Sequence, residues 1–272
     1  MTTERSPATV FSSELVSAFS IRLKGAGIHM ALSLCVALLA FSVVYFVWYP
    51  GAFWCIAGGR ELFQLIVTVD VVLGPLLTFA IFNPGKGWGR LKFDLVVIGL
   101  LQLLALIYGL STVAQARPVY LVFTGDRFNM VTAGDLAECD LALAERPEFA
   151  HIPWSGPRLV GTRPPANEEE RFSLINDSIE GKDVELQPKF YVPYEENQVR
   201  VAARALPLEK LRAKNSGAEA RDLLDSALQR LAPQKPENLR WLPVMARTQE
   251  WVVLLDAQHR MRPMVYLPLQ GF

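Results

Sequence analysis

The histidines and cysteines of this chain are too far apart to form a familiar metal-binding or catalytic motif. His29, His151 and His259 are scattered, and no HxxxH, HExxH or CxxC spacing occurs. Those spacings matter because the ligands of a metal must converge from one or two elements. The sequence therefore predicts no metal site, no cofactor and no catalytic residue.

Three other segments resemble catalytic motifs only superficially. Residues 83–87 (NPGKG) lack the GxxxxGK[ST] pattern of a phosphate-binding loop and are more typical of a turn. Ser155 and Gly156 lack the GxSxG pattern of a nucleophile elbow. The glutamates at 168–170 are typical of the first turn of a helix, where acids are favoured. We therefore predict that the protein is not an enzyme.

Asp70 has an unusual setting for a charged residue, because it lies within a long apolar segment. A carboxylate exposed to lipid is costly, so its side chain should face other helices. Tyr108 and Ser42 fall at nearly the same depth in two further apolar segments, and we expect Asp70 to form a hydrogen bond with one of them. Gln102 lies at a different depth and is less well placed. A proton or ion site is the alternative, but transporters usually place several such residues along a path, so we favour a structural or partner-binding role.

The residues that follow Asp70 should shape the same helix. Pro75 has no N–H and crowds the carbonyl of Val71, so a kink is expected there. Gly74 allows a neighbouring helix to approach closely. Gly74 and Pro75 therefore join Asp70 and Tyr108 as candidate structural or partner-binding residues.

Composition places these residues in a membrane protein. Lys+Arg and Asp+Glu both total 27, so the net charge is zero, which argues against a nucleic-acid-binding protein. Hydrophobic residues make up 51% of the chain, and they are concentrated in three segments at about 28–48, 62–82 and 95–114. Each segment is long enough to cross a bilayer as a helix. Buried core helices, and a signal peptide for the first segment, are alternatives that fit these lengths and flanks less well.

Basic residues set the orientation of the three predicted spans. Two of them precede the first span and three lie near the turn between the second and third, namely Arg22, Lys24, Lys86, Arg90 and Lys92. Such residues tend to stay in the cytoplasm. We therefore predict a cytoplasmic N-terminal segment 1–27, a three-helix membrane domain 28–117 and an exported domain 118–272. In a bacterium with two membranes, the helices cross the inner membrane and the exported domain is periplasmic.

The two ends of the first span carry further signals. Trp48, Tyr49 and Trp54 are placed where an aromatic belt would lie at the outer face of the bilayer. Residues 2–24 have apolar side chains at a spacing of four, which fits a short amphipathic helix on the inner leaflet. A disordered tail fits the same residues equally well.

Two cysteines fall on the oxidising side of the membrane under this topology. A disulfide between Cys55 and Cys139 would tie the first exported loop to the exported domain. Two free or buried thiols are the alternative, and the sequence does not give the distance that would decide.

The exported domain has an α+β pattern at its start. Residues 119–123 and 127–131 flank a Thr-Gly-Asp turn and predict a β-hairpin. Residues 133–145 have helical spacing, whereas 152–166 are rich in proline and glycine and predict a loop. A helix is expected to begin at Asn167.

The rest of the domain predicts helix and then strands. Residues 206–231 are helical, with a break at 215–217. Short apolar strands are predicted at 240–245, 251–255 and 264–269, and Pro243 and Pro268 suggest that two of them lie at sheet edges. An uncovered edge could accept a strand from a partner; the alternative is an edge covered by the Pro-rich loop. The expected fold class is a membrane protein with three transmembrane α-helices followed by a periplasmic α+β domain.

Several segments together resemble the type IV pilin accessory protein family (TfpX/TfpZ). The resemblance covers about residues 22–131 and depends on the combination of motifs, and no motif is recognised in 135–272. The matching residues begin with Phe46, Val47, Trp48, Tyr49, Pro50 and Gly51, followed by Gly58 and Gly59, the run from Asp70 through Gly74 and Pro75 to Thr78, residues 82–86, residues 91–95, Gln102, Ala105, Tyr108, Gly109, Arg117 and Pro118.

The resemblance implies a chaperone-like inner-membrane helper that assists the stability or assembly of a type IV pilin without catalysis. It implies the major pilin as partner, with other pilus assembly proteins and membrane lipid as further contacts and no nucleic acid. Trp48, Tyr49, Pro50 and Gly51 are then candidate structural or partner-binding residues. A membrane-anchored periplasmic sensor or binding module of the cell envelope is the alternative, but the cytoplasmic parts are too small to hold an output domain.

The chain does not have the features of a pilin itself. A prepilin has a cleavage-site glycine followed five residues later by glutamate. The residue five positions after Gly25 is Met30, and the one after Gly27 is Leu32. Pilins also have one membrane helix, whereas three are predicted here.

Overall fold

The chain forms two compact units, and it passes between them more than once. The computed structural model describes residues 7–81, 87–231, 234–246 and 249–272, with side chains from residue 19 onward except that of residue 88. The helical unit contains the residues up to Val44 and Arg60–Val113, and the sheet unit contains Tyr45–Gly59 and Ala114–Phe272. The loop between the first two long helices therefore belongs to the C-terminal domain.

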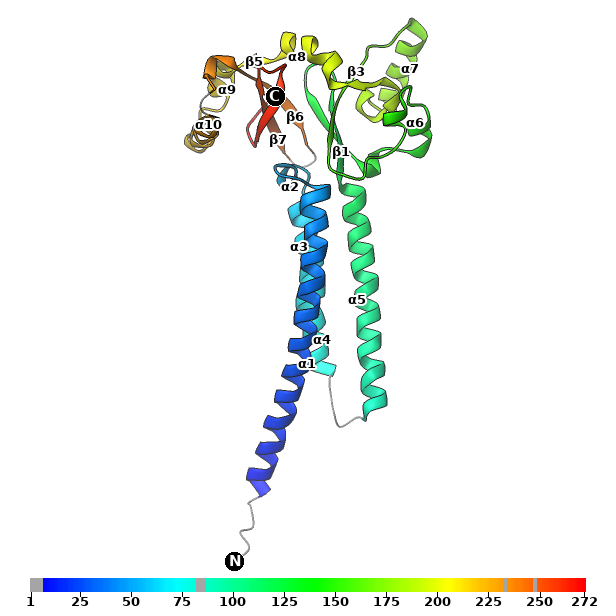
Figure 1. Cartoon of the computed structure of the whole chain (residues 1–272), viewed down its shortest axis with the longest axis vertical. Helices are drawn as coiled ribbons and strands as arrows, with labels where there is room; N and C mark the ends of the chain where they lie inside the picture. Colours follow the sequence, from blue (N-terminus) through cyan, green and yellow to red (C-terminus); the bar gives the residue numbers. More distant parts are fainter. Residues whose placement is uncertain (1–6, 82–86, 232–233, 247–248) are drawn as a thin grey trace, which may run out of the picture. The chain divides into compact units, whose positions relative to one another are not determined.

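The helical unit contains the three predicted spans. Three stretches are long and apolar enough to cross a membrane: Phe19–Trp48, Gly59–Ile81 and Gly89–Ala116. The elements that form them are α1 (Pro7–Val43), the π-helical segment η1 (Val44–Trp48), α3 (Gly59–Val67), the π-helical segment η2 (Thr68–Leu73), α4 (Gly74–Ile81) and α5 (Trp88–Ala116) (Figure 1). The prediction of three long membrane helices is confirmed.

Two predictions at the ends of these helices need comment. α1 runs without a break from Pro7, so the described part of residues 2–24 is the start of the first long helix and not a separate element. The turn predicted at 83–87 lies outside the described residues except for Gly87, which has a positive φ of 83°.

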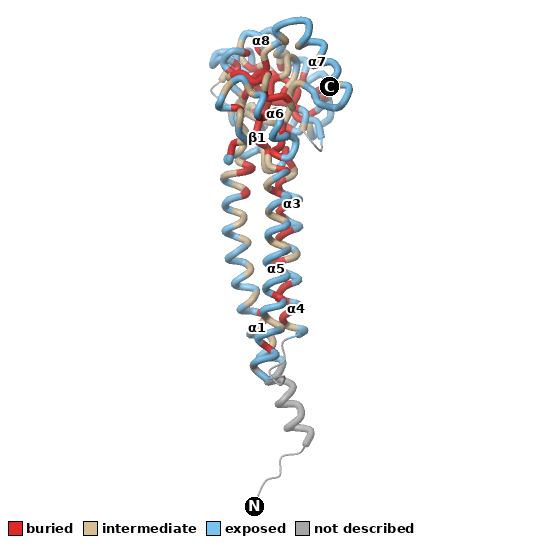
Figure 2. Tube along the Cα trace, turned by 90° about the vertical axis from the view of Figure 1, so that its right-hand side faces the viewer, coloured by how far each residue is buried: buried red, intermediate tan, exposed pale blue. Residues whose placement is uncertain are grey.

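The three long helices are packed unequally. α1 lies against η2 and α4, whereas α5 makes few contacts with the other helices among the described residues. Figure 2 shows long exposed stretches along all of these helices, in contrast to the buried centre of the sheet unit. Apolar side chains that no protein covers are typical of a helix that faces lipid.

The sheet unit is built on one mixed sheet. The strand order is β4-β3-β1-β2-β6-β7-β8, and β5 also pairs with β6. Neighbours are antiparallel except for β1 with β3 and β2 with β6. The strands are β1 (Pro118–Phe123), β2 (Phe128–Thr132), β3 (Arg158–Thr162), β4 (Tyr191–Pro193), β5 (Leu206–Pro207), β6 (Leu239–Met245), β7 (Glu250–Asp256) and β8 (Arg262–Leu267).

Short helices connect and flank these strands. They are α2 (Phe53–Ile56), α6 (Glu138–Ala142), α7 (Glu168–Ile179), α8 (Gln198–Arg204), α9 (Leu208–Lys214) and α10 (Ala218–Arg230). Asn167 caps α7, because its side-chain oxygen accepts a hydrogen bond from the Glu170 N–H over 2.8 Å. The predicted hairpin, the start of α7, the break between α9 and α10 and the three final strands are all confirmed.

Three predictions about this domain are wrong. β3 lies inside the segment predicted as a loop, because a short strand paired with β1 gives little periodic signal of its own. The single helix predicted at 133–145 is instead two short ones, a 3-10 helix at Ala133–Asp135 and α6. Pro243 lies in an interior strand and not at an edge: β6 pairs with β5 at Trp241 and with β2 at Val244, and Pro243 falls between these pairings, where no N–H is needed.

Candidate functional site

The first loop of the chain is part of the hydrophobic core of the sheet unit. Within α2, Ile56 is fully buried in a cluster that includes Leu121 of β1. The ring of Phe53 lies 5.1 Å from the ring of Tyr266 on β8. The segment between the first two long helices therefore folds as an element of the C-terminal domain and not as a free connection.

An arginine lies close to two tryptophans beside this loop. The guanidinium carbon of Arg117 is 5.8 Å from the ring centroid of Trp48 and 5.8 Å from that of Trp154. The two indole rings are themselves 5.8 Å apart, edge to face. Aromatic faces stabilise a cation that burial removes from water. We call Trp48, Arg117 and Trp154 the tryptophan clamp.

Arg117 has one backbone acceptor in its own unit, whereas its Nε atom has no hydrogen-bond partner among the described residues. Arg117 Nη1 donates a hydrogen bond to the carbonyl oxygen of Ala114 over 2.5 Å. Burial lowers the pKa of Arg117 below its ordinary value, and an interaction with Tyr49 opposes this shift. Because an arginine pKa starts so high, the guanidinium stays charged beside the two rings.

The backbone near Trp154 is fixed against the loop. The Gly156 N–H donates a hydrogen bond to the carbonyl oxygen of Val47 over 2.6 Å. A Cβ atom at position 156 would lie 2.8 Å from the carbonyl oxygen of Trp48 and would overlap the ring of Pro50. Only glycine permits this approach, so Gly156 has a packing role that the search for a nucleophile elbow did not reveal.

The candidate residues Trp48, Tyr49, Pro50 and Gly51 lie together in this loop. Gly51 has a φ of 62°, a left-handed conformation that favours glycine. The Pro50 carbonyl accepts a hydrogen bond from the Phe53 N–H as α2 begins. The expected aromatic belt is a wrong interpretation for Trp48 and Tyr49, which are only 7% and 0% exposed. Trp48 packs against Trp154, which the local sequence could not reveal, and Tyr49 packs against Trp54 within the loop.

The second candidate region surrounds Asp70 in the helical unit. Asp70 lies in the π-helical segment η2 and is 8% exposed. Its backbone carbonyl accepts a hydrogen bond from Gln102 Nε2 on α5 over 3.2 Å. In a π-helix the N–H of residue 75 would donate a hydrogen bond to this carbonyl, but Pro75 has no N–H. Gln102 supplies the missing donor. A Cβ atom on Gly74 would overlap the Gln102 side chain, so Gly74 permits this close approach.

The predicted hydrogen bond from Asp70 to Tyr108 or Ser42 is absent. Ser42 Oγ donates to the carbonyl oxygen of Leu38 over 2.8 Å, and Tyr108 is 76% exposed. Asp70 Oδ1 has no hydrogen-bond partner among the residues that the structure describes. The prediction was wrong because depth alone does not fix the facing side of a helix, and because a helical serine can bond to its own preceding turn.

His29 also has a partner that the sequence did not indicate. Its Nδ1 atom lies 2.5 Å from Thr78 Oγ1, which joins α1 to α4. Thr78 is buried, so this contact satisfies a polar group within the helical unit. It gives His29 a structural role.

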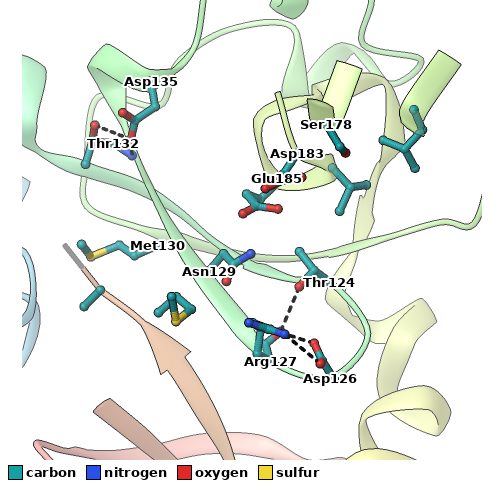
Figure 3. A pocket seen from close by; sticks show the side chains of 14 residues that line it. Thr124, Asp126, Arg127, Asn129, Met130, Thr132, Asp135, Ser178, Asp183 and Glu185 are labelled. Atoms are coloured by element: carbon teal, nitrogen blue, oxygen red, sulfur yellow. Dashed lines mark hydrogen bonds and ion pairs between the residues drawn. The ribbon is translucent and has the colours of Figure 1, made fainter. Parts of the chain in front are cut away.

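A polar hollow of about 650 Å³ lies beside β2 in the sheet unit (Figure 3). Arg127 is paired there with Asp126 over 2.9 Å, which lowers the pKa of that carboxyl despite its partial burial. Burial raises the pKa of Glu185 on the other side of the hollow. The lining contains no histidine or cysteine, and no group of three metal-ligating side chains occurs in the part of the chain that the structure describes. The lining combines hydroxyl and carboxylate side chains, such as Ser178 and Glu185, with apolar ones such as Leu174.

The cysteines do not form the disulfide that the sequence suggested. Cys35, Cys55 and Cys139 are all free and exposed. α2 buries Ile56 and leaves the adjacent Cys55 on its exposed side. The alternative of two free thiols is the one observed.

Comparison with known proteins shows where this chain belongs. A family model described as "Fimbrial assembly protein FimB" matches residues 17–58, which include α2 and the loop before it. The chain is 37% identical over 239 residues to the fimbrial assembly protein of Dichelobacter nodosus serogroup I, and 36% identical to that of serogroup E1. Each alignment covers 88% of this chain and 92% of the relative. The protein of serogroups C1 and C2 is 42% identical over 118 residues, covering 43% of this chain. No solved structure matches.

Proposed function

Because this chain belongs to the family of fimbrial assembly proteins, we propose that it is a non-catalytic, chaperone-like protein of the bacterial inner membrane that holds a type IV pilin before assembly. Its role as an accessory of pilus assembly follows from the family. The 37% identity over 88% of the chain is the observation that carries it. The pilin as client and the chaperone-like action are the proposed part.

The architecture supports this role. An accessory that holds a membrane-inserted client needs contacts inside the bilayer and a folded domain beside it, and this chain has both. The sheet unit incorporates the loop 45–59, so this loop and residues 114–272 must lie on the same side of the membrane. We propose that this side is the periplasm, with the N-terminus and the turn around Lys86 in the cytoplasm, as the basic residues indicate.

The proposed domain boundaries follow from this arrangement. We propose a cytoplasmic segment 1–27, a membrane domain 28–117 and a periplasmic domain 118–272. Residues 45–59 fold with the periplasmic domain although they lie between two spans. The sensor alternative is less well supported, because family membership accounts for the membrane helices and the folded domain together.

Deletion of the gene tests the proposed function. We expect fewer surface pili and a lower level of the pilin in membranes, because an unassisted client is degraded or left unassembled. Re-expression of the intact chain should restore both. Normal piliation and an unchanged pilin level in the deletion strain would contradict the proposal.

Thiol labelling of single-cysteine variants tests the orientation. A maleimide that does not cross the inner membrane should label Cys55 and Cys139, because both thiols are free and exposed. A Gly87→Cys variant of the cysteine-free chain should be labelled only after lysis. The opposite pattern would reverse the proposed topology.

A further inference from the structure

The helical unit contains a buried carboxylate oxygen with no partner. Asp70 is more than nine-tenths buried, and its Oδ1 atom has no hydrogen-bond donor among the described residues. Gln102 donates its hydrogen bond to the backbone carbonyl of Asp70 and not to the Asp70 side chain. A polar atom in a low-dielectric setting is costly to leave unpaired, so this carboxylate is suited to a donor that comes from elsewhere.

A hollow lies next to this carboxylate. It has a volume of about 360 Å³ and is bounded by α3, η2 and α5. Its walls are mostly apolar and include Leu65 and Ile66, and the α5 side carries the small residues Ala105 and Gly109 four positions apart. Small residues at this spacing let helices approach closely in a membrane, and a Cβ atom at Gly109 would lie 2.8 Å from the Ile66 side chain, so Gly109 permits the approach of α3 itself. We call this hollow the Asp70 groove.

The sparse packing of α5 leaves the Asp70 groove accessible from the bilayer. Tyr108 lines the groove and is 76% exposed, and Leu65 on the opposite wall is 66% exposed. Acyl chains could cover these apolar surfaces, but they have no hydrogen-bond donor for Asp70. A second copy docked by two-fold symmetry would bring a further carboxylate into the same apolar surroundings. A different helix with a donor or a cation matches the groove better.

We propose that the Asp70 groove receives the membrane-spanning helix of the client pilus subunit, with a hydrogen-bond donor or cationic group of that helix placed on the Asp70 carboxylate. This inference rests on the proposed function, and it names the surface at which the protein binds its client. The apolar walls contact the aliphatic face of the client helix, and Asp70 fixes its depth and rotation. A buried polar contact is well suited to that second task because it specifies one register among many apolar ones.

Photo-crosslinking in piliated cells tests this proposal. A photoreactive phenylalanine derivative is introduced at Tyr108, which lines the groove, or at Ile107, which is 56% exposed and does not line it. The two positions are adjacent on α5 and lie at the same depth. We expect the adduct to the pilus subunit to form from position 108 and to be about fivefold weaker from position 107.

Two variants test the part played by the groove itself. Asp70→Leu should reduce the crosslink from position 108 about fivefold to tenfold, as expected for the loss of one buried polar contact. Ala105→Phe fills the groove without altering Asp70. It is tested with the photoreactive residue placed at Leu65 on the opposite wall, and it should reduce the crosslink from that position to a similar extent. Leu103→Ala, on an exposed face of α5 outside the groove, is the matched control and should change neither. Membrane levels of each variant show whether it accumulates normally.

The outcomes distinguish failure of the groove proposal from failure of the proposed function. A crosslink to a second copy of this chain, a crosslink to lipid alone, or equal adducts from positions 107 and 108 would overturn the groove proposal. If piliation depends on the gene but no groove crosslink forms, the inference fails and the proposed function stands. If piliation does not depend on the gene, the proposed function fails first.

Discussion

Two charged residues, the half-buried Arg117 in the sheet unit and the buried Asp70 in the helical unit, have very different surroundings in the same chain. Arg117 lies 5.8 Å from each of two indole rings and donates to a backbone carbonyl within its own unit. Asp70 is the more deeply buried of the two, at 8% exposed, and its Oδ1 atom has no donor among the described residues. Arg117 Nε also has no acceptor there, but this guanidinium has a backbone acceptor and two indole rings close to it, whereas the structure shows no such contacts for the Asp70 carboxylate.

The two regions have different roles, one in stability and the other in recognition of a partner. The loop 45–59, the tryptophan clamp and Gly156 all pack together within the sheet unit. The Asp70 groove is incomplete within this chain. Substitutions in the first region should therefore destabilise the protein, and substitutions in the second should mainly weaken its association with a partner.

The largest effect is expected at Ile56. Ile56→Ala removes a fully buried side chain that joins the loop to the sheet core, and it should lower the free energy of unfolding by about 2–5 kcal/mol. Equilibrium chemical unfolding of the full chain in detergent, followed by tryptophan fluorescence, measures this loss. Ile179→Ala is the control, because Ile179 is 80% exposed. Equal stability of the two variants would mean that the loop is not part of the core.

The tryptophan clamp should give the next largest effect. Arg117→Ala removes the cation beside Trp48 and Trp154 and the packing of its aliphatic stem, so we expect a loss of about 0.5–2 kcal/mol. Arg117→Lys should recover part of it. The same unfolding measurement applies, with the exposed Arg171→Ala as the control. If the alanine and lysine variants are as stable as the parent, the clamp has no structural role.

A smaller effect, and one that depends on pH, is expected at Glu170. Arg163 and the Ala166 N–H bond to this carboxyl and lower its pKa from 4.5 to about 2. Its contribution to stability is therefore complete above pH 4.5 and is lost as the pH falls toward 2. Glu170→Gln should remove about 1 kcal/mol or less at neutral pH, since water screens the pair, and should flatten the stability profile between these pH values. An unchanged profile would show that the ion pair is not maintained in solution.

The smallest effect on the isolated chain is expected at Asp70. Asp70→Leu removes a carboxylate that lacks a full set of partners, so the free energy of unfolding should change by less than about 1 kcal/mol or should rise. Thermal unfolding of the purified protein in detergent measures this. A loss comparable to that of Ile56→Ala would indicate that Asp70 has an internal structural role.

The sequence predicted the larger features of the fold and fewer of the site contacts. Long apolar runs predict spans because length and composition alone decide them, and the hairpin at β1 and β2 follows from local turn chemistry. β3 and the interior position of Pro243 depend on pairing with distant strands, which leaves no local periodic pattern. Gly74 was predicted to allow a close approach, but Gln102 as its neighbour was not.

The tryptophan clamp shows the same limit more clearly. Trp48, Tyr49, Pro50 and Gly51 were selected because they resemble a family motif, and they do lie in one loop. Trp154, more than a hundred residues further along the chain, could not be associated with them before the fold was known. An arginine directly after a membrane helix is the signal that could have prompted the search.

The most direct test of the contrast between the two units is the recovery of a pilus subunit with the purified chain. The tagged protein is isolated from membranes of piliated cells as the parent, as Asp70→Leu and as Leu103→Ala, and the co-purifying pilus subunit is quantified by mass spectrometry. We expect the parent and Leu103→Ala to recover similar amounts of the pilus subunit. Asp70→Leu should recover at least about fivefold less, although this variant is as stable as the parent. Equal recovery with all three proteins, or no pilus subunit with the parent, would contradict the account.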